Sequence, residues 1–269
     1  MGYLEEHRKQ LRYEKTALSP SATRAGWQNI SPWPFRGFVL ILTVYAVIQG
    51  KFTWWDPLWI LLFHHLWYIL GLEIPYHRLA AHRAFSTPLW IRNILLSIGV
   101  LLCHPPALPW MSTHRMHHKY SDTKYDPHSP YNRKFGVLNY IMVPIYDSMF
   151  PWEFANDQYF MWLYRWQFWL IWVSAIIILS IFGMHTFLIV YGIPSAISAF
   201  LLGAANYYAH MGEFNGHDYT KNRYWLELIA PGMGFHKTHH DHPSRWNLCD
   251  RYPILDVSSW IIWLIKKRN

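Results

Sequence analysis

Residues 160–209 read FMWLYRWQFWLIWVSAIIILSIFGMHTFLIVYGIPSAISAFLLGAANYYA, and this stretch decides the fold. It contains two apolar runs, 160–182 and 186–209, which are separated only by Gly183–His185. A helix needs about 20 apolar residues to cross the hydrocarbon core of a bilayer, and both runs reach that length. Because the connection between them is so short, we expect the two runs to form a helical hairpin.

Two shorter apolar runs precede this stretch, at residues 38–54 and 58–76. Their strongly apolar parts are about 15 residues long, so they span a bilayer only if Trp54 and Tyr76 lie at its interfaces. A buried helix of a soluble core is the alternative for runs of this length. We expect an all-α integral membrane protein with four transmembrane helices arranged as two hairpins.

The composition of the 269 residues agrees with a chain that is partly in lipid and partly in water. The chain is 52% hydrophobic and 19% aromatic but only 15% charged, which excludes a disordered protein. A mean hydropathy of −0.01 is nevertheless too polar for a chain that lies wholly in the membrane. The two cysteines are too few for a disulfide framework.

The basic residues predict the topology. All but Lys51 and Arg165 of the 24 Lys and Arg lie in an N-terminal tail, residues 1–36, or in residues 76–159 and those after 210. The positive-inside rule places these regions in the cytoplasm, where 77–159 and 210–269 form a helical cap. The net charge of +8 therefore points to a membrane surface and not to nucleic acid. A bacterial inner membrane and the endoplasmic reticulum remain equally open.

Shorter apolar segments of the cap predict helices that lie in the membrane interface. They are residues 91–102, 137–150 and 260–265, the last of which ends in the basic residues Lys266 and Lys267.

Eight of the 17 histidines gather in three clusters next to the predicted span ends, and an isolated histidine, His210, follows the fourth span. In a helix, residues three and four apart lie on one face, so each HxxHH triplet presents three imidazoles together. Asn206 precedes His210 by one turn, whereas His77 and His82, five residues apart, do not share a face of an α-helix. The nine candidate ligands are His77, His82, His114, His117, His118, His210, His236, His239 and His240.

Nine imidazoles are too many for one metal ion and fit two ions in a shared site. Imidazole binds iron, zinc and copper, so the type of ligand does not select the metal. Four acidic residues are candidates to orient ligand imidazoles: Glu73, Asp126, Glu213 and Asp241. Solvated loop acids are the simpler interpretation of the last two. His64 and His65, inside the second span, are interpreted as packing residues.

The motifs resemble those of the membrane-bound fatty acid desaturases, specifically the acyl-CoA (delta-9, stearoyl-CoA type) branch. The matching strings are HRLAAHRAF at 77–85, HRMHHKYSDTKYDPHS at 114–129, NYYAH at 206–210 and GFHKTHHDHP at 234–243. The resemblance implies a single desaturase domain over residues 1–269, in which the nine histidines are catalytic and hold two iron ions that activate O2. It also implies that Asn206 holds a metal-bound water. His104 departs from the family, which usually has glutamine there.

By this resemblance the chain introduces a double bond, delta-9-like, into a long acyl chain carried by CoA, a carrier protein or a lipid. The sequence has no haem, flavin or rubredoxin-like motif, so a separate electron carrier of the cytochrome b5, ferredoxin or rubredoxin type is expected. Acetylenases, hydroxylases and terminal-alkene-forming decarboxylases share such motifs and stay open as alternatives. A histidine-rich membrane metal transporter or sensor is the alternative from another class, although its ligands are expected at mid-membrane.

Overall fold

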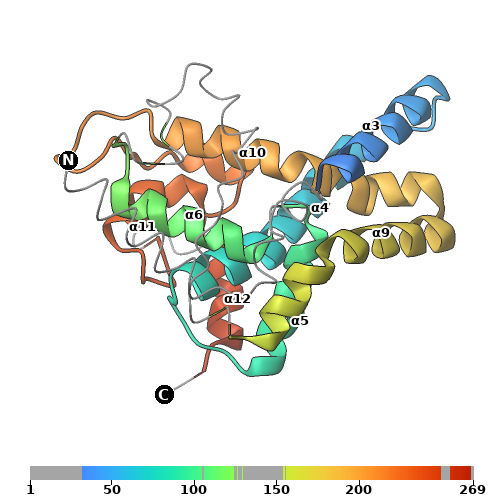
Figure 1. Ribbon diagram of the computed structural model, residues 1–269. Helices are drawn as coiled ribbons and strands as arrows, with labels where there is room; N and C mark the ends of the chain where they lie inside the picture. Colours follow the sequence, from blue (N-terminus) through green and yellow to red (C-terminus); the bar gives the residue numbers. More distant parts are fainter. Residues whose placement is uncertain are drawn as a thin grey trace, which may run out of the picture.

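The chain is all-helical in the part that the computed structural model describes, residues 32–104, 106–123, 126, 129, 154, 156–249 and 255–267 (Figure 1). The α-helices are α3 (Pro32–Ile48), α4 (Asp56–Tyr68), α5 (Leu89–Leu101), α6 (Ala107–Tyr120), α9 (Gln158–Phe187), α10 (Ile193–Ala209), α11 (His236–Asp241) and α12 (Val257–Ile265). Two π-helices follow α4 and α9, η2 (Ile69–Ala81) and η4 (Leu188–Gly192), and two short 3₁₀-helices are η5 (Tyr224–Leu228) and η6 (Met233–Phe235). The all-α prediction is confirmed for these residues.

Two helical stretches, Asp56–Ala81 and Gln158–Ala209, are long and apolar enough to cross a membrane. The second is 52 residues long and reverses at Gly183, whose backbone is not helical (φ 76°, ψ 171°). Glycine suits this turn because a side chain disfavours positive φ. Figure 1 shows the chain beyond the turn running back beside α9 towards α10. The reversal lies where the sequence predicts the tip of a hairpin.

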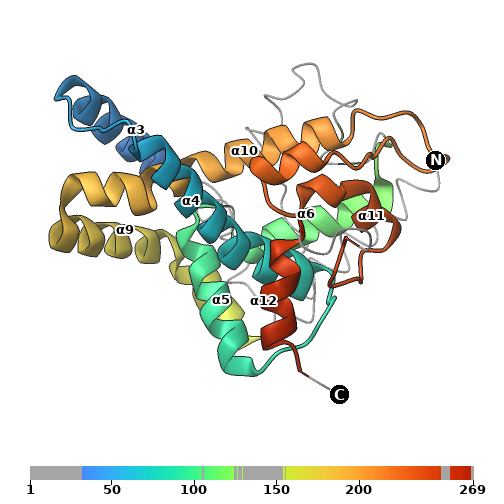
Figure 2. The same ribbon diagram turned by 180° about the vertical axis from the view of Figure 1, so that it is seen from behind.

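The tip of this hairpin contacts the turn between α3 and α4. The Nε2 atom of His185 lies 2.9 Å from Oδ2 of the buried Asp56. The backbone amide of Thr53 donates to the same carboxylate oxygen at 2.7 Å. Both tips project from the side of the molecule opposite α6 and α11, as Figure 2 shows from behind.

Large apolar side chains on α3, α4 and α9 point away from the protein. Examples are Ile41, Leu62 and Ile181, which are 69%, 52% and 66% exposed. Large exposed apolar side chains along three helices fit contact with an apolar partner or a lipid environment.

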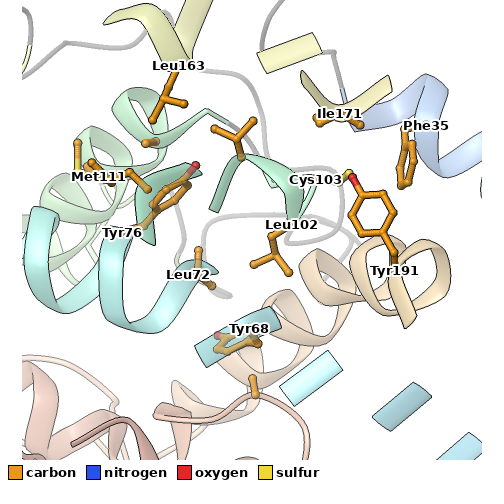
Figure 3. Packing of buried hydrophobic residues seen from close by; sticks show 14 of the residues in the cluster. Phe35, Tyr68, Leu72, Tyr76, Leu102, Cys103, Met111, Leu163, Ile171 and Tyr191 are labelled. Carbon is orange, nitrogen blue, oxygen red and sulfur yellow. The ribbon is translucent and has the colours of Figure 1, made fainter. Parts of the chain in front are cut away.

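A buried core connects the helical hairpins to the end of the molecule that carries the histidines (Figure 3). Tyr68 and Leu72, from α4 and η2, are almost fully buried together with Leu102 and Tyr191. Since apolar burial stabilises at roughly 25 cal/mol per Å², this core fixes the direction in which η2 leaves α4. The direction of η2 in turn sets where the first histidine ligands lie.

Two helix ends differ from the sequence prediction. The helix predicted over 38–54 ends at Ile48, and Gly50 (φ 59°) begins the turn. The helix predicted over 58–76 continues as η2 to Ala81. Two of the predicted interfacial segments are helical, as α5 and α12, whereas residues 1–31 and 137–150 lie outside the described residues.

The close contact between η2 and α5 depends on two glycines. A Cβ atom at Gly99 would overlap the ring of Tyr76 and the carbonyl oxygen of Gly71. Overpacking of this kind costs about 1–3 kcal/mol, so we expect Gly99→Ala to lower the unfolding temperature of the detergent-solubilised protein, followed by tryptophan fluorescence. Gly37→Ala is the matched control, since a Cβ there meets nothing within 4 Å. Equal unfolding temperatures for the two variants would contradict this packing.

Candidate metal centre

All nine predicted ligand histidines come together at one end of the molecule. They lie on η2 and the residue that follows it, on α6, at the end of α10 and on α11. Within each of two groups, the ligand nitrogens lie within 4.8 Å of one another. The five-histidine group is His77, His82, His114, His118 and His239, and the four-histidine group is His117, His210, His236 and His240.

The π-helix η2 explains how His77 and His82 converge. The amide of His82 donates to the carbonyl of His77 at 3.1 Å, the five-residue hydrogen bond of a π-turn. This wider turn brings residues five apart onto one side, and the two imidazole centroids are 5.0 Å apart. Residues five apart do not share a face of an α-helix, so this pair has to converge in another way, and the π-turn is that way.

Each HxxHH triplet divides its ligands between the two groups. On α6, His114 and His118, four residues apart, belong to the five-histidine group, and His117 turns to the other group. On α11 the assignment is reversed, because His236 and His240 belong to the four-histidine group and His239 crosses to the five-histidine group. The two helices thus contribute to both groups, which places the groups side by side.

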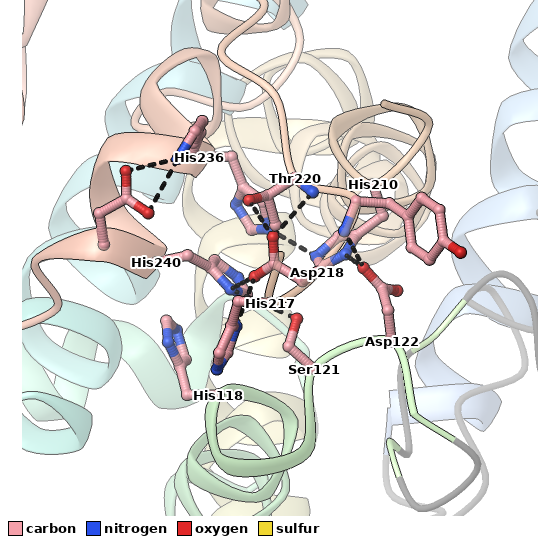
Figure 4. Close-up of polar contacts among 12 residues, drawn as sticks. His118, Ser121, Asp122, His210, His217, Asp218, Thr220, His236 and His240 are labelled. Atoms are coloured by element: carbon pink, nitrogen blue, oxygen red, sulfur yellow. Dashed lines mark hydrogen bonds and ion pairs between the residues drawn. The ribbon is translucent and has the colours of Figure 1, made fainter. Parts of the chain in front are cut away.

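Carboxylates hold the Nδ1 atoms of four of these histidines, and Figure 4 shows two of the pairs, His210 with Asp122 and His240 with Asp218. Since a carboxylate is an acceptor, Nδ1 carries the proton in each pair, and Nε2 keeps its lone pair. The pairs are His77 with Glu73 at 2.7 Å, His117 with Asp126 at 2.9 Å, His210 with Asp122 at 2.8 Å and His240 with Asp218 at 3.1 Å.

The Nε2 lone pairs point into the two groups. Nε2 of His210 lies 2.8 Å from Nε2 of His236, and Nε2 of His77 lies 2.8 Å from Nε2 of His239. The buried Nε2 of His240 has no hydrogen-bond partner among the described residues. Facing lone pairs repel unless a proton or a cation lies between them, and a buried nitrogen without a partner is costly. The donor set therefore fits a metal ion in each group.

Burial keeps most of these imidazoles in the neutral form that binds metals. It lowers the pKa of His82 to about 2, together with the charges of His77 and Arg115. His117 differs, because the charge and hydrogen bond of Asp126 outweigh the effect of burial and leave its pKa raised. Burial raises the pKa of Asp218, but hydrogen bonds from Thr220 outweigh it and lower the pKa to about 2, so this carboxylate stays ionised.

Of the four acids proposed to orient ligands, Glu73 and Asp126 contact histidine ligands and two do not. Glu213 is exposed, and Asp241 pairs with Lys237 on the surface. Two further aspartates that contact ligand histidines, Asp122 and Asp218, were not predicted from the sequence, because they lie in loops far apart along the chain. Asp122 does lie inside the string 114–129 that contains the second histidine cluster, whereas no motif contains Asp218.

Asn206 lies half-buried on α10, one turn before His210. Its carbonyl accepts the His210 amide at 3.1 Å, so the two residues occupy successive turns of the same helix face. This position next to the four-histidine group is the one that the spacing predicts.

His64 is buried and His65 is half-buried, and each contacts a backbone carbonyl, in agreement with their interpretation as packing residues. Their Nε2 atoms lie 2.8 Å from the carbonyl of Ile229 and 3.2 Å from that of Glu227. His104 is buried against Ser198, at 3.1 Å, and belongs to neither histidine group. His128 lies outside the described residues.

The fold and the site define a helical protein with paired histidine groups that suit metal binding, and comparison with known proteins identifies the family. Residues 52–255 match the family described as fatty acid desaturase. This match covers most of the chain, which therefore belongs to the fatty acid desaturase family. The relatives of this chain are desaturases, which are oxidoreductases. The prediction that the chain is an oxidoreductase is therefore confirmed.

Several relatives cover most of the chain at modest identity. The delta-9 acyl-lipid desaturase 2 of Arabidopsis thaliana is 26% identical over 88% of this chain and 80% of its own length. The sn-1 stearoyl-lipid 9-desaturase of Anabaena variabilis is 29% identical over 73% of this chain and 75% of its own. An acyl-CoA C20 delta5-desaturase of Anemone leveillei is 27% identical over 86% and 77%.

Proposed function

We propose that this chain is an O2-dependent di-iron desaturase that introduces a double bond, delta-9-like, into a long acyl chain linked to a lipid or to CoA. The observation that carries the proposal is the convergence of nine imidazoles into two groups whose Nε2 lone pairs point inward. The names of the relatives, which include acyl-lipid 9-desaturases, support the substrate class. Family membership also weighs against a metal transporter or sensor.

Side chains alone cannot break the unactivated C–H bond of an acyl chain by acid–base chemistry. Two iron ions, when bound, supply the oxidising chemistry with O2 and two external electrons. The protein contributes the nine ligands and the carboxylates that keep the Nδ1 protons in place, such as Glu73 and Asp122. Burial of His77, His210 and His236 keeps bulk water from the ligands. We propose that Asn206 holds a water molecule at the four-histidine group.

We further propose four membrane spans, formed by α3, by α4 with η2, and by the two arms that meet at Gly183. The outward apolar side chains of α3, α4 and α9 support this arrangement. The contact between Asp56 and His185 supports placing both hairpin tips on one side of the membrane. The histidine groups lie at the opposite end, where the basic residues predict the cytoplasm. A separate electron carrier would then reach the site from the cytoplasm.

The experiment that tests this function is to express the chain in a host membrane with an electron donor and to profile the acyl chains by mass spectrometry. Monounsaturated products with the double bond at carbon 9, present with the wild type and absent with His117→Ala, are the expected result. Hydroxylated, acetylenic or chain-shortened alkene products would assign the chain to a relative with the same site. An unchanged profile under conditions that load the metal would contradict the proposal.

A further inference from the structure

The two histidine groups differ in the number of carboxylates that contact them. In the four-histidine group, three of the four imidazoles donate Nδ1–H to an aspartate. In the five-histidine group, within the described part of the chain, only His77 donates to a carboxylate, that of Glu73. The aspartates of the four-histidine group are Asp122, Asp126 and Asp218.

Basic side chains lie near the five-histidine group and reduce its negative charge further. The carboxylate of Glu73 accepts from Nε of Arg78, at 2.7 Å, as well as from His77. Arg115 donates to the carbonyl of Ala81, the residue before His82, at 2.7 Å. A guanidinium is therefore close to each of the two ligands that η2 positions, and each guanidinium disfavours a high charge on an ion held there.

Apart from the ligand histidines, Asp122 and Asp218 accept mainly from neutral donors, and the ionisable donor among the described residues is the exposed His217, 3.4 Å from Asp218. Besides His210, Asp122 accepts from the Ser129 hydroxyl at 3.0 Å and the Tyr219 amide at 2.9 Å. Asp218 accepts from the hydroxyl of Thr220 at 2.6 Å and the side-chain amide of Asn215 at 2.7 Å. These hydrogen bonds hold the carboxylates in position without cancelling their charge.

We propose that Asp122, Asp126 and Asp218 are positioning residues that make the four-histidine group the site of the more highly charged metal ion. An anionic partner on Nδ1–H makes Nε2 a stronger ligand, and such partners typically change metal affinity by about 10–100-fold. The inference rests on the proposed function only in taking iron as the metal. With iron bound, the ion in the five-histidine group accepts an electron first, and the ion in the four-histidine group stays ferric longer.

The test uses the purified full chain in detergent, loaded with ⁵⁷Fe(II), oxidised in air and reduced stepwise with dithionite. Each electron from dithionite converts one Fe(III) to Fe(II), and Mössbauer spectra follow the two irons separately. We expect two distinct signals that are reduced in sequence. A single signal, or two signals reduced in parallel, would overturn the proposal.

Variants assign the signals to the two groups. Asp122→Asn and Asp218→Asn keep the size of the side chain and should shift only the signal that is reduced last, with a loss of Fe(II) affinity of about 10–100-fold at that site. Glu73→Gln should shift only the signal that is reduced first. Asp241→Asn, an exposed acid on α11, is the matched control and should shift neither. Effects of Asp122→Asn and Glu73→Gln on the same signal would overturn the assignment.

This outcome is separable from that of the acyl-chain assay. Two unequal irons in a protein that leaves acyl chains unchanged would support this inference and contradict the proposed function. Desaturation by a protein whose two irons are equivalent would support the proposed function and contradict this inference.

Discussion

Replacing His239 with alanine is expected to lower acyl-chain oxidation by more than about 100-fold. Removing only a residue that hydrogen-bonds to a ligand already lowers metal affinity or activity by about 10–100-fold, and His239 is itself a proposed ligand. Nε2 of His239 lies 2.8 Å from Nε2 of both His77 and His118, so it occupies the middle of the five-histidine group. The variant should also retain less iron than the wild type. Product per milligram of protein and iron by elemental analysis are the two measurements.

The matched control for this prediction is His242→Ala. His242 is an exposed histidine just beyond α11, three residues from His239, and belongs to neither group. Its loss should leave activity and iron content unchanged. Tryptophan fluorescence checks that both variants are folded, and His118→Ala provides a second ligand variant. Full activity in folded His239→Ala would contradict the assignment of the five-histidine group.

Replacing Arg78 with methionine should destabilise the protein by about 3–5 kcal/mol, the usual cost of leaving a buried ion-pair partner uncompensated. Arg78 is 1% exposed and lies between Glu73, at 2.7 Å, and Asp256, at 2.8 Å. It also donates to the carbonyl of Trp246 at 2.7 Å. Since Asp256 also accepts from the amide of Ser259 at the start of α12, the variant should loosen α12 from η2.

Thermal unfolding in detergent, followed by tryptophan fluorescence, measures this effect. Lys237→Met is the matched control, since it removes a basic residue from the exposed pair with Asp241, where an ion pair is worth about 0–1 kcal/mol. The unfolding temperature of Arg78→Met should lie well below that of Lys237→Met. Similar temperatures would show that the buried network does not hold η2 and α12 together.

The clustering of the histidine triplets on α6 and α11 was predictable, because the spacing within each triplet follows the periodicity of one helix. His114 and His118, or His236 and His240, lie four residues apart, and a helix turn brings such residues together whatever surrounds it. The assignment of each ligand to a group was not predictable in this way. It depends on how α6 and α11 face each other, which is a property of the tertiary fold and not of either segment.

The π-helix and the orienting aspartates were not predicted from the sequence. The five-residue spacing of His77 and His82 is the spacing of a π-turn, and weighing that geometry beside the α-helix would have explained the pair. Asp122 and Asp218 carry no such signal. They lie in loops, and the fold alone brings them to His210 and His240.

The iron content of the purified wild-type chain, reconstituted with Fe(II) and freed of unbound metal, tests the two-metal centre most directly. Two iron ions per chain are predicted from the two histidine groups. One ion per chain, or none, in folded protein would contradict the view that the nine histidines form two metal sites.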